Sequence, residues 1–217
     1  CKKMHELGDP ECICTYCYAH DNFIGFKAKT MLNKYVSSTE NLTSRIYDFN
    51  EIPYLDYTYV KNMYSVFRIE TFGELNSVKD GGVNQAINYI NLILKNEHIN
   101  FGWFTKRPEI IDKALKKLGI NIPDNVNILY SSYYLNNMHK GRKENIKRVL
   151  EKYSFISGVF TVYTAKYAIE HNININCGDA NCLNCLKCYN AHTDIFYINE
   201  IKKDEQNDYY KMIAKNQ

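Results

Sequence analysis

The sequence predicts an α/β protein built on parallel strands, as a partial (TIM-like) barrel or an open sheet, with cysteine-rich loops at both termini. Strand-like runs alternate with amphipathic helices between residues 62 and 176, and the eight cysteines divide into two groups of four at the two ends of the chain. Repeated strand–helix units imply parallel strands joined by crossovers. Five predicted strands are too few for a closed eight-stranded barrel.

The length of 217 residues suits a single α/β domain over 1–217. Its parts are an N-terminal cysteine loop, the strand–helix repeats, a C-terminal cysteine loop and a polar tail, at 1–20, 62–176, 177–190 and 191–217. A net charge of +3 is too small to indicate nucleic-acid binding by itself. No apolar run approaches the ~20 residues of a membrane span, and no secretory segment opens the chain. We therefore expect a cytoplasmic protein without a membrane partner.

The order of elements follows from hydrophobic periodicity. The predicted strands are 65–70, 99–105, 126–131, 156–163 and 173–176. The predicted helices are two pieces within 23–47, then 83–96, a helix from Pro108 to about Leu118, 144–152 and 165–171, with a helical tail within 193–217. Proline is favoured at the first position of a helix, which sets the start at Pro108.

The C-terminal cysteines have the spacing C-x4-C-x2-C-x2-C, at Cys177, Cys182, Cys185 and Cys188. Structural zinc usually takes two C-x2-C pairs separated by a dozen or more residues. An unbroken C-x2-C-x2-C run instead resembles the cysteine run of bacterial ferredoxins, so we favour an iron–sulfur cluster, of the 4Fe-4S type. Zinc is the alternative, and free thiols or disulfides come third. In the cytoplasm such groups are metal or redox ligands rather than disulfides.

The N-terminal group contains Cys1, Cys12, Cys14 and Cys17, which we take as a second set of metal ligands. Whether the two groups form one centre or two is open at this stage.

The carboxyl ends of parallel strands are where chemistry collects in such folds. Reading those ends along the chain gives Lys106, Ser131 and Cys177 as candidate site residues, with Glu74 in the turn after the first strand. Lys106 could bind an anionic group, or could be a solvated charge.

Arg68 and Glu70 share one face of the strand SVFRIE by its period of two. A charge on a covered parallel strand needs a partner. The two side chains could therefore face a substrate, or form a structural ion pair.

The run KGRKENIKR at 140–148 is basic and predicted to be helical. A nucleic-acid face is one interpretation, but a solvated helix exterior is favoured because no aromatic side chains are interleaved.

Several motifs in order carry a family resemblance: a cysteine group ending in CYA at Cys17, the turn FRIETFGEL, the segment FGWFTKRP, and the closing cysteine run. The chain resembles the phage-associated "gene product eighty-eight" family in this layout, over most of residues 1–190.

More widely, the chain is similar to radical S-adenosylmethionine (radical SAM) enzymes. The matching positions are the cysteine loop ending at Cys17-Tyr18 and the turn Gly73-Glu74. The resemblance implies a partial α/β barrel, a cluster on Cys12, Cys14 and Cys17, and Gly73 and Glu74 on the amino group of S-adenosylmethionine. The spacing here is C-x-C-x2-C rather than C-x3-C-x2-C, and a single glycine precedes Glu74.

These observations together predict an iron–sulfur protein, a radical-SAM-like redox enzyme whose substrate the sequence does not specify. The expected catalytic residues are Glu74, Arg68, Glu70 and Lys106, and the expected cofactor-binding residues are Gly73, Glu74, Tyr18 and Ser131. An electron donor is the expected partner. The alternatives are a zinc-stapled structural or nucleic-acid-interacting phage protein, and a two-cluster electron-transfer protein without a substrate.

Overall fold

The computed structural model describes residues 5–16, 38–56, 66–69, 74–75, 81–178, 182–190 and 194–216. Its centre is a five-stranded parallel sheet in the order β1-β2-β3-β6-β7. The strands are β1 (Val66–Ile69), β2 (Asn100–Thr105), β3 (Val126–Ser131), β6 (Ile156–Tyr163) and β7 (Phe196–Ile201). The predicted α/β class and parallel sheet are therefore confirmed.

The described helices are α4 (Gly81–Lys95), α5 (Pro108–Leu118), α6 (Ile146–Lys152), α7 (Ala165–Glu170), α8 (Cys182–Cys185) and α9 (Gln206–Asn216), with a further helical segment at 38–44. Short 3-10 helices are η1 (Ile13–Tyr16), η2 (Phe49–Glu51), η3 (Leu135–Asn137) and η4 (Lys203–Glu205). Pro108 starts α5 as predicted, and Gly119 ends it in the left-handed conformation that favours glycine (φ 67°).

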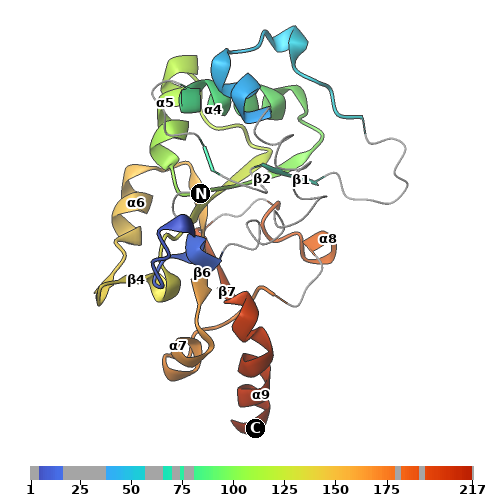
Figure 1. The fold of residues 1–217 in the computed structure, drawn as a ribbon. Coiled ribbons are helices and arrows are strands. Elements are labelled where there is room, and N and C mark those ends of the chain that lie inside the picture. The colour runs from blue at the N-terminus through green and yellow to red at the C-terminus, as the bar shows by residue number, and fades with distance from the viewer. Residues whose placement is uncertain are drawn as a thin grey trace, which may run out of the picture.

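One face of the sheet, here called the helix face, carries the main core. Phe101 and Trp103 of β2 are fully buried there, together with Ile128 of β3 and Val159 of β6. The apolar sides of α4 and α5 and part of α6 cover these residues (Figure 1). Each of these strands alternates its side chains between two faces, so the neighbouring residues project to the opposite side.

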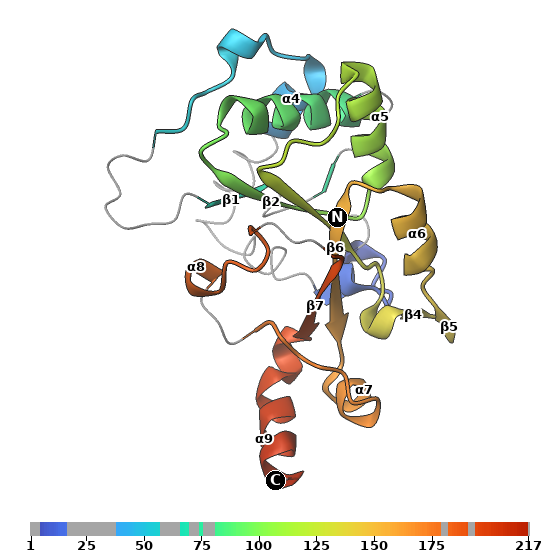
Figure 2. The ribbon, with the colours of Figure 1, turned by 180° about the vertical axis from the view of Figure 1, so that it is seen from behind.

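The opposite side, here called the cysteine-loop face, is covered differently. Leu129, Phe196 and Ile198 are buried there with Phe104 and Phe160, and Cys177 and Cys188 pack against this cluster. Figures 1 and 2 show α8 and its loop on this side, with α4 and α5 on the other. The helices of the first three crossovers, α4, α5 and α6, thus lie on one face, whereas α8, in the crossover from β6 to β7, lies on the other.

Asparagines fasten the segment 38–56 to the outside of α4. The Asn88 side chain donates to the carbonyls of Leu42 and Arg45 and accepts from the Tyr47 backbone N–H. Asn96 accepts from the Leu55 N–H and donates to the Pro53 carbonyl. These bonds satisfy backbone groups that have no partner within a helix or strand.

Two sequence predictions about the chain's last third are wrong. The segment 173–176 is not a strand. It lies beside β7 through the Asn176 side chain, which donates to the Tyr197 carbonyl and accepts from the Asn199 backbone N–H. The one β-bridge of this region is between Cys177 and Glu200. The fifth strand is instead β7, in the tail that was predicted to be helical. The helical expectation holds only for α9 within that tail.

The basic run 140–148 is also not a helix as predicted. Its first part is a two-stranded hairpin of β4 (Met138–His139) and β5 (Arg142–Lys143), and α6 begins only at Ile146. Lys140 and Gly141 form the turn with φ values of 48° and 73°, which suits a two-residue hairpin.

No helix among the described residues is long and apolar enough to cross a membrane.

Candidate metal and cofactor site

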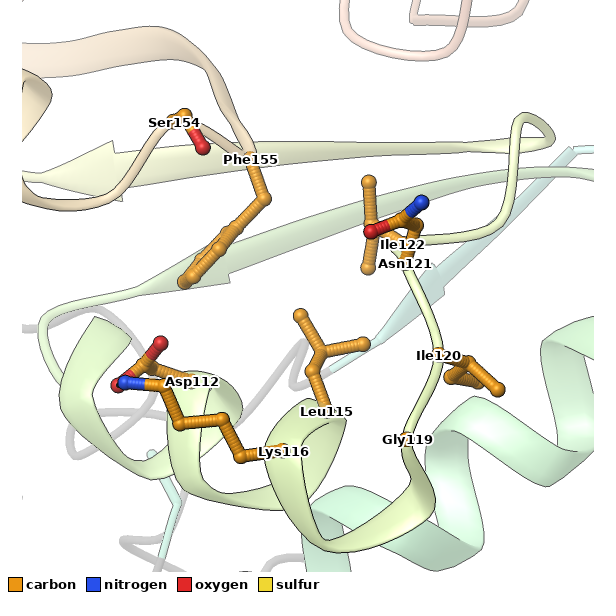
Figure 3. A pocket seen from close by; sticks show the side chains of 9 residues that line it. All are labelled: Asp112, Leu115, Lys116, Gly119, Ile120, Asn121, Ile122, Ser154 and Phe155. Atoms are coloured by element: carbon orange, nitrogen blue, oxygen red, sulfur yellow. The ribbon is translucent and has the colours of Figure 1, made fainter.

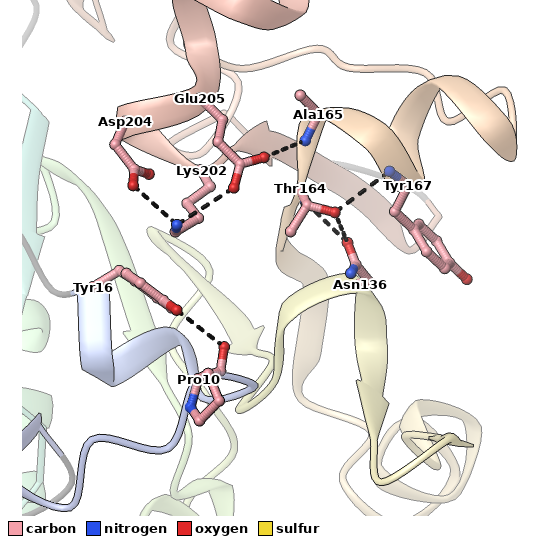
Figure 4. Close-up of polar contacts among 9 residues, drawn as sticks. All are labelled: Pro10, Tyr16, Asn136, Thr164, Ala165, Tyr167, Lys202, Asp204 and Glu205. Atoms are coloured by element: carbon pink, nitrogen blue, oxygen red, sulfur yellow. Dashed lines mark hydrogen bonds and ion pairs between the residues drawn. The ribbon is translucent and has the colours of Figure 1, made fainter.

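The N-terminal cysteine loop lies at the carboxyl edge of the sheet. The Ile13 N–H donates to the Tyr133 carbonyl (2.9 Å), and Cys12 bridges to Tyr134, just beyond the end of β3. At the other end of this loop the Tyr16 ring lies under the Lys202 ammonium, 3.8 Å from the ring centroid, at the end of β7 (Figure 4). The loop therefore spans the ends of several strands.

Cys12 and Cys14 are both buried in this loop. A hydrogen bond between their sulfurs lowers the pKa of Cys14, which the nearby Lys106 ammonium lowers further. The same bond, together with burial, raises the pKa of Cys12. The remaining members of the predicted group, Cys1 and Cys17, and the neighbouring Tyr18, lie outside the described residues.

Lys106 is the best-fixed side chain at this edge. Its backbone N–H donates to Glu74 Oε2 (2.5 Å), its carbonyl accepts from the Tyr133 hydroxyl (3.1 Å), and its Nζ donates to Ser131 Oγ (2.7 Å). The ends of β2 and β3 thus hold one ammonium group in a fixed place beside the N-terminal cysteines.

Glu74 lies next to Lys106 and is tied to the same strand end. Its Oε1 accepts from the Thr105 hydroxyl (2.7 Å) and from the Leu75 N–H (3.0 Å). Burial raises the pKa of Glu74, although the Lys106 N–H, the Thr105 hydroxyl and the Lys106 charge all favour its ionised form. The structure thus brings together three predicted site residues, Glu74, Lys106 and Ser131. Gly73 and Glu70 lie outside the described residues.

The C-terminal cysteine loop crosses the other face of the sheet. Cys177 pairs with Glu200 near the carboxyl end of β7, whereas the Cys188 carbonyl accepts from Asn127 Nδ2 (3.3 Å), near the amino end of β3. Asn127 also donates to the Asn190 carbonyl. The loop therefore runs down the cysteine-loop face, and of its cysteines Cys177 lies by the carboxyl end of a strand.

Gly102 provides the surface on which this loop rests. A Cβ atom at Gly102 would lie 3.0 Å from the Tyr189 ring and 3.2 Å from the Cys188 carbonyl oxygen. Any side chain there would push against the loop, so the missing side chain allows the loop to approach the sheet closely.

Neighbouring thiols of this loop affect the pKa values of Cys177 and Cys188. Burial raises the pKa of Cys177 to about 11, and the charges of Glu200, Cys182 and Cys185 add to the increase. Burial and the neighbouring thiols raise the pKa of Cys188 to about 12, against the opposing charge of Arg68. Cys182 and Cys185 are exposed and lie one turn apart in α8, on the same side of that turn.

Arg68 contributes a positive charge to this face. Its side chain leaves β1 opposite Gly102, and its guanidinium lies 4.2 Å from the Phe104 ring centroid. Its charge opposes the increase that burial causes in the pKa values of Cys188, Tyr189 and Glu200. Sequence reasoning missed Glu200, a strand residue on this face whose pKa is raised by burial; the alternation of FYINEI would have placed it had 196–201 been recognised as a strand.

All six described cysteines are free thiols. In the described parts of the chain, no three Cys, His, Asp or Glu side chains converge on one point at metal-ion distance. Soft sulfur donors in this number suit iron–sulfur clusters or zinc. The cysteine ligands of an iron–sulfur cluster lie farther apart than the four ligands of a single tetrahedral metal ion, because each cysteine binds a different iron and the sulfides of the cluster lie between the irons.

A pocket of about 540 Å³ lies elsewhere, at the amino edge of the sheet between α5 and the segment before β6 (Figure 3). Its lining mixes apolar side chains, including Leu115, Ile122 and Phe155, with polar ones, and its acid Asp112 is paired with Lys116 (2.7 Å). No cysteine or histidine lines this pocket.

Comparison of the chain with protein-family models, curated proteins and solved structures finds no match. The function proposed below therefore depends on the residues and their geometry.

Proposed function

We propose that this protein binds iron–sulfur clusters and acts as a radical-SAM-like redox enzyme. The observation that carries the proposal is the C-terminal loop, which brings four free thiols within reach of one another's charge, beside Arg68 and against one face of a parallel sheet. Cys177 and Cys188 have raised pKa values, and a metal centre would compensate the charge of such thiolates and favour their ionised form.

Cys177, Cys182, Cys185 and Cys188 would hold one cluster. Cys12, Cys14 and Cys17, with or without Cys1, would hold a second one at the carboxyl edge, and S-adenosylmethionine would need the iron that a three-cysteine set leaves free. Free thiols suit the reducing cytoplasm of a bacterial host, the location we propose for the chain.

The strand order supports the radical-SAM-like part of the proposal. Five parallel strands in sequence order, with the helices of the first three crossovers on one face, correspond to a segment of a (β/α) barrel, in which the opposite face is the interior. Polar side chains from separate strands face this side, namely Arg68, Asn127 and Glu200, which would suit a substrate-bearing interior.

A reduced iron–sulfur cluster supplies the electron that cleaves S-adenosylmethionine in enzymes of this kind. At the carboxyl edge, Lys106 would hold an anionic group through the ammonium donors left after its bond to Ser131 Oγ. Glu74 would accept an amino group through its remaining lone pairs, and burial of the edge would exclude water. Gly73, Tyr18 and Glu70 keep their predicted roles in this proposal.

Metal analysis of anaerobically purified protein tests the proposal. We expect iron and acid-labile sulfide in equal amounts, about four of each per 4Fe-4S cluster. The double variant Cys182→Ser/Cys185→Ser should lose one cluster's content and Cys12→Ser/Cys14→Ser the other's. A colourless protein that contains zinc and neither iron nor sulfide would refute the proposal.

Addition of S-adenosylmethionine separates the enzyme from an electron-transfer protein. We expect it to change the EPR spectrum of the reduced wild type and of Cys182→Ser/Cys185→Ser, but not of Cys12→Ser/Cys14→Ser. An unchanged wild-type spectrum would instead support a two-cluster electron-transfer protein that does not bind S-adenosylmethionine.

A further inference from the structure

A strap of the chain, residues 45–56, lies over the outer side of α4 and displays apolar side chains to solvent. The asparagine side chains described above hold its backbone against the helix and the helix end. Its Ile52 is buried beneath it, whereas Ile46, Phe49 and Tyr54 are 38%, 49% and 62% exposed. Figures 1 and 2 both show this segment at the margin of the molecule beyond α4. We call residues 45–56 the aromatic strap.

The exposed rings of the aromatic strap are held in place by the end of α4. Lys95, the last residue of the helix, donates to the Phe49 carbonyl (3.0 Å), and its ammonium lies 5.5 Å from the Phe49 ring centroid. His98 Nε2 donates to the Leu55 carbonyl (2.8 Å), and its ring centroid lies 4.9 Å from that of Tyr54. Aromatic side chains are enriched in protein interfaces, and rings that are already fixed lose less entropy on binding. The strap thus has the composition and rigidity of a protein contact surface.

The pocket beside α5, here called the α5 pocket, lies at the same edge of the molecule as the end of the strap. Tyr54 contacts His98, two residues before β2, and the pocket is lined by the segments 119–122 before β3 and 154–155 before β6. The Asn125 side chain ties the first of these segments to the end of α4, by donating to three carbonyls there (3.0–3.2 Å). The strap and the pocket are therefore both fixed to the end of α4, at the amino edge of the sheet.

The α5 pocket is a hollow that suits an aromatic ring. Leu115 and Phe155 point into it from opposite sides (Figure 3). Its volume of about 540 Å³ is larger than a tyrosine side chain needs. The side chains of Asn121 and Ser154 add hydrogen-bonding groups to the lining, and a tyrosine hydroxyl usually takes such a partner when it is buried.

The charges of the two surfaces are complementary. The aromatic strap carries one cation, Arg45, and three carboxylates, Asp48, Glu51 and Asp56. The segment 112–124, which contributes most of the pocket lining, carries three lysines and two aspartates. Opposite net charges speed the association of two surfaces and set their orientation. The carboxylates of the strap also disfavour a nucleic-acid backbone as its partner.

We propose that two copies of this chain form a dimer, in which the aromatic strap of each copy places Tyr54 and Phe49 against the α5 pocket of the other. Because both surfaces lie at one edge of the molecule, a two-fold axis between the copies can bring the two contacts together and close the assembly. The carboxyl edge, with Lys106 and Cys12, lies at the other end of the strands and stays uncovered. This inference goes beyond the proposed function and holds with or without a bound metal.

Sedimentation velocity of the full-length protein at a series of concentrations tests the proposal. A reductant is present, so that the exposed Cys182 and Cys185 cannot link two copies through a disulfide. We expect wild type to dimerise, and Phe49→Ser/Tyr54→Ser to raise the dimer Kd at least about tenfold, because aromatic anchors carry much of the binding energy of such contacts. Ile120→Glu, at the pocket, should have a similar effect, because it replaces an apolar contact with a charge of the same sign as the strap.

Tyr210→Ser/Met212→Ser is the matched control. It removes an aromatic and an apolar side chain that are 39% and 45% exposed on α9, which Figures 1 and 2 show at the opposite end of the molecule from the strap. We expect this variant to dimerise like wild type. All the substituted side chains are exposed, so circular dichroism should show folded proteins throughout. A dimer that the strap variant leaves intact, or that the control weakens equally, would overturn the proposal.

A mixture of the two weakened variants tests the pairing of strap with pocket. An Ile120→Glu copy keeps an intact strap, and a Phe49→Ser/Tyr54→Ser copy keeps an intact pocket, so a heterodimer retains one of the two contacts. We expect the mixture to associate more strongly than either variant alone and more weakly than wild type. A mixture that associates no more than its components would overturn the pairing. A wild type that stays monomeric at about 100 µM would overturn the dimer and leave the strap to a different protein.

Discussion

Glu74 fixes the chain after β1 against the end of β2, through Thr105 and the Lys106 N–H. Its raised pKa has a consequence for stability. The folded protein keeps the Glu74 proton over a pH range in which the unfolded chain, with a glutamate pKa of about 4.3, has lost it. The folded state binds more protons in this range, so the Glu74 contribution to stability falls as the pH rises.

Glu74→Gln tests this assignment. We expect the free energy of unfolding of the variant to be about 1–3 kcal/mol lower than that of wild type at acid pH. The reason is that an amide cannot accept from all three donors around Glu74. The difference from wild type should shrink as the pH rises from about 4 through the raised pKa. Urea denaturation at a series of pH values measures it, and a difference that grows with pH would contradict the assignment.

Gly102 carries the contact between the sheet and the C-terminal cysteine loop. Gly102→Ala should cost about 1–3 kcal/mol of stability, because the added methyl group meets Tyr189 and the Cys188 carbonyl. We also expect a lower iron content in the purified variant. Tyr189→Ala should restore part of the loss when combined with Gly102→Ala, and strictly additive effects in this double-mutant cycle would speak against the contact.

At the scale of elements, β7 is the feature that sequence reasoning missed. Its six residues alternate between a buried face, with Phe196 and Ile198, and a face on which Tyr197 is half-exposed. The strand lies in a polar tail next to a helix. The NININ repeat at 172–176, just before Cys177, alternates more regularly and is therefore the stronger sequence signal for a fifth strand. Tertiary pairing with β6 decides the outcome, and no local pattern contains that information.

The other four strands of the main sheet and the helices α4 to α7 were predictable because their patterns are local. β3 and β6 match their predicted ranges, and α5 starts at its proline. The site was predictable only in part. Strand ends gave Lys106 and Ser131, but the paths of the cysteine loops depend on long-range contacts such as Asn127 with Cys188.

Two neighbouring substitutions test the assignment of β7. Ile198→Ala should destabilise the protein by about 2–5 kcal/mol, because it opens a cavity in a buried cluster. Tyr197→Ala, on the other side of the strand, should cost less than about 1 kcal/mol. Chemical denaturation compares the two, and similar costs would be inconsistent with a strand buried on one side.

At the scale of the whole molecule, the parallel sheet carries Cys12 and Cys14 at its carboxyl edge and the C-terminal cysteine loop across the face opposite α4 and α5. Each group lies beside one cation from the sheet, Lys106 for Cys12 and Cys14 and Arg68 for Cys188. A positive charge near an anionic centre favours its reduced form.

This arrangement predicts separate electrostatic control of the two centres. Arg68→Gln should lower the reduction potential of the centre that Cys182→Ser/Cys185→Ser removes, and should leave the other unchanged. Redox titration followed by EPR measures both potentials. Equal shifts in both centres would show that the two cysteine groups share one environment.

Anomalous diffraction from anaerobically grown crystals at the iron and zinc absorption edges tests the central claim most directly. The account predicts a strong iron signal enclosed by Cys177, Cys182, Cys185 and Cys188, and a second one beside Cys12 and Cys14. A signal at the zinc edge alone, from single ions at these cysteines, would contradict it.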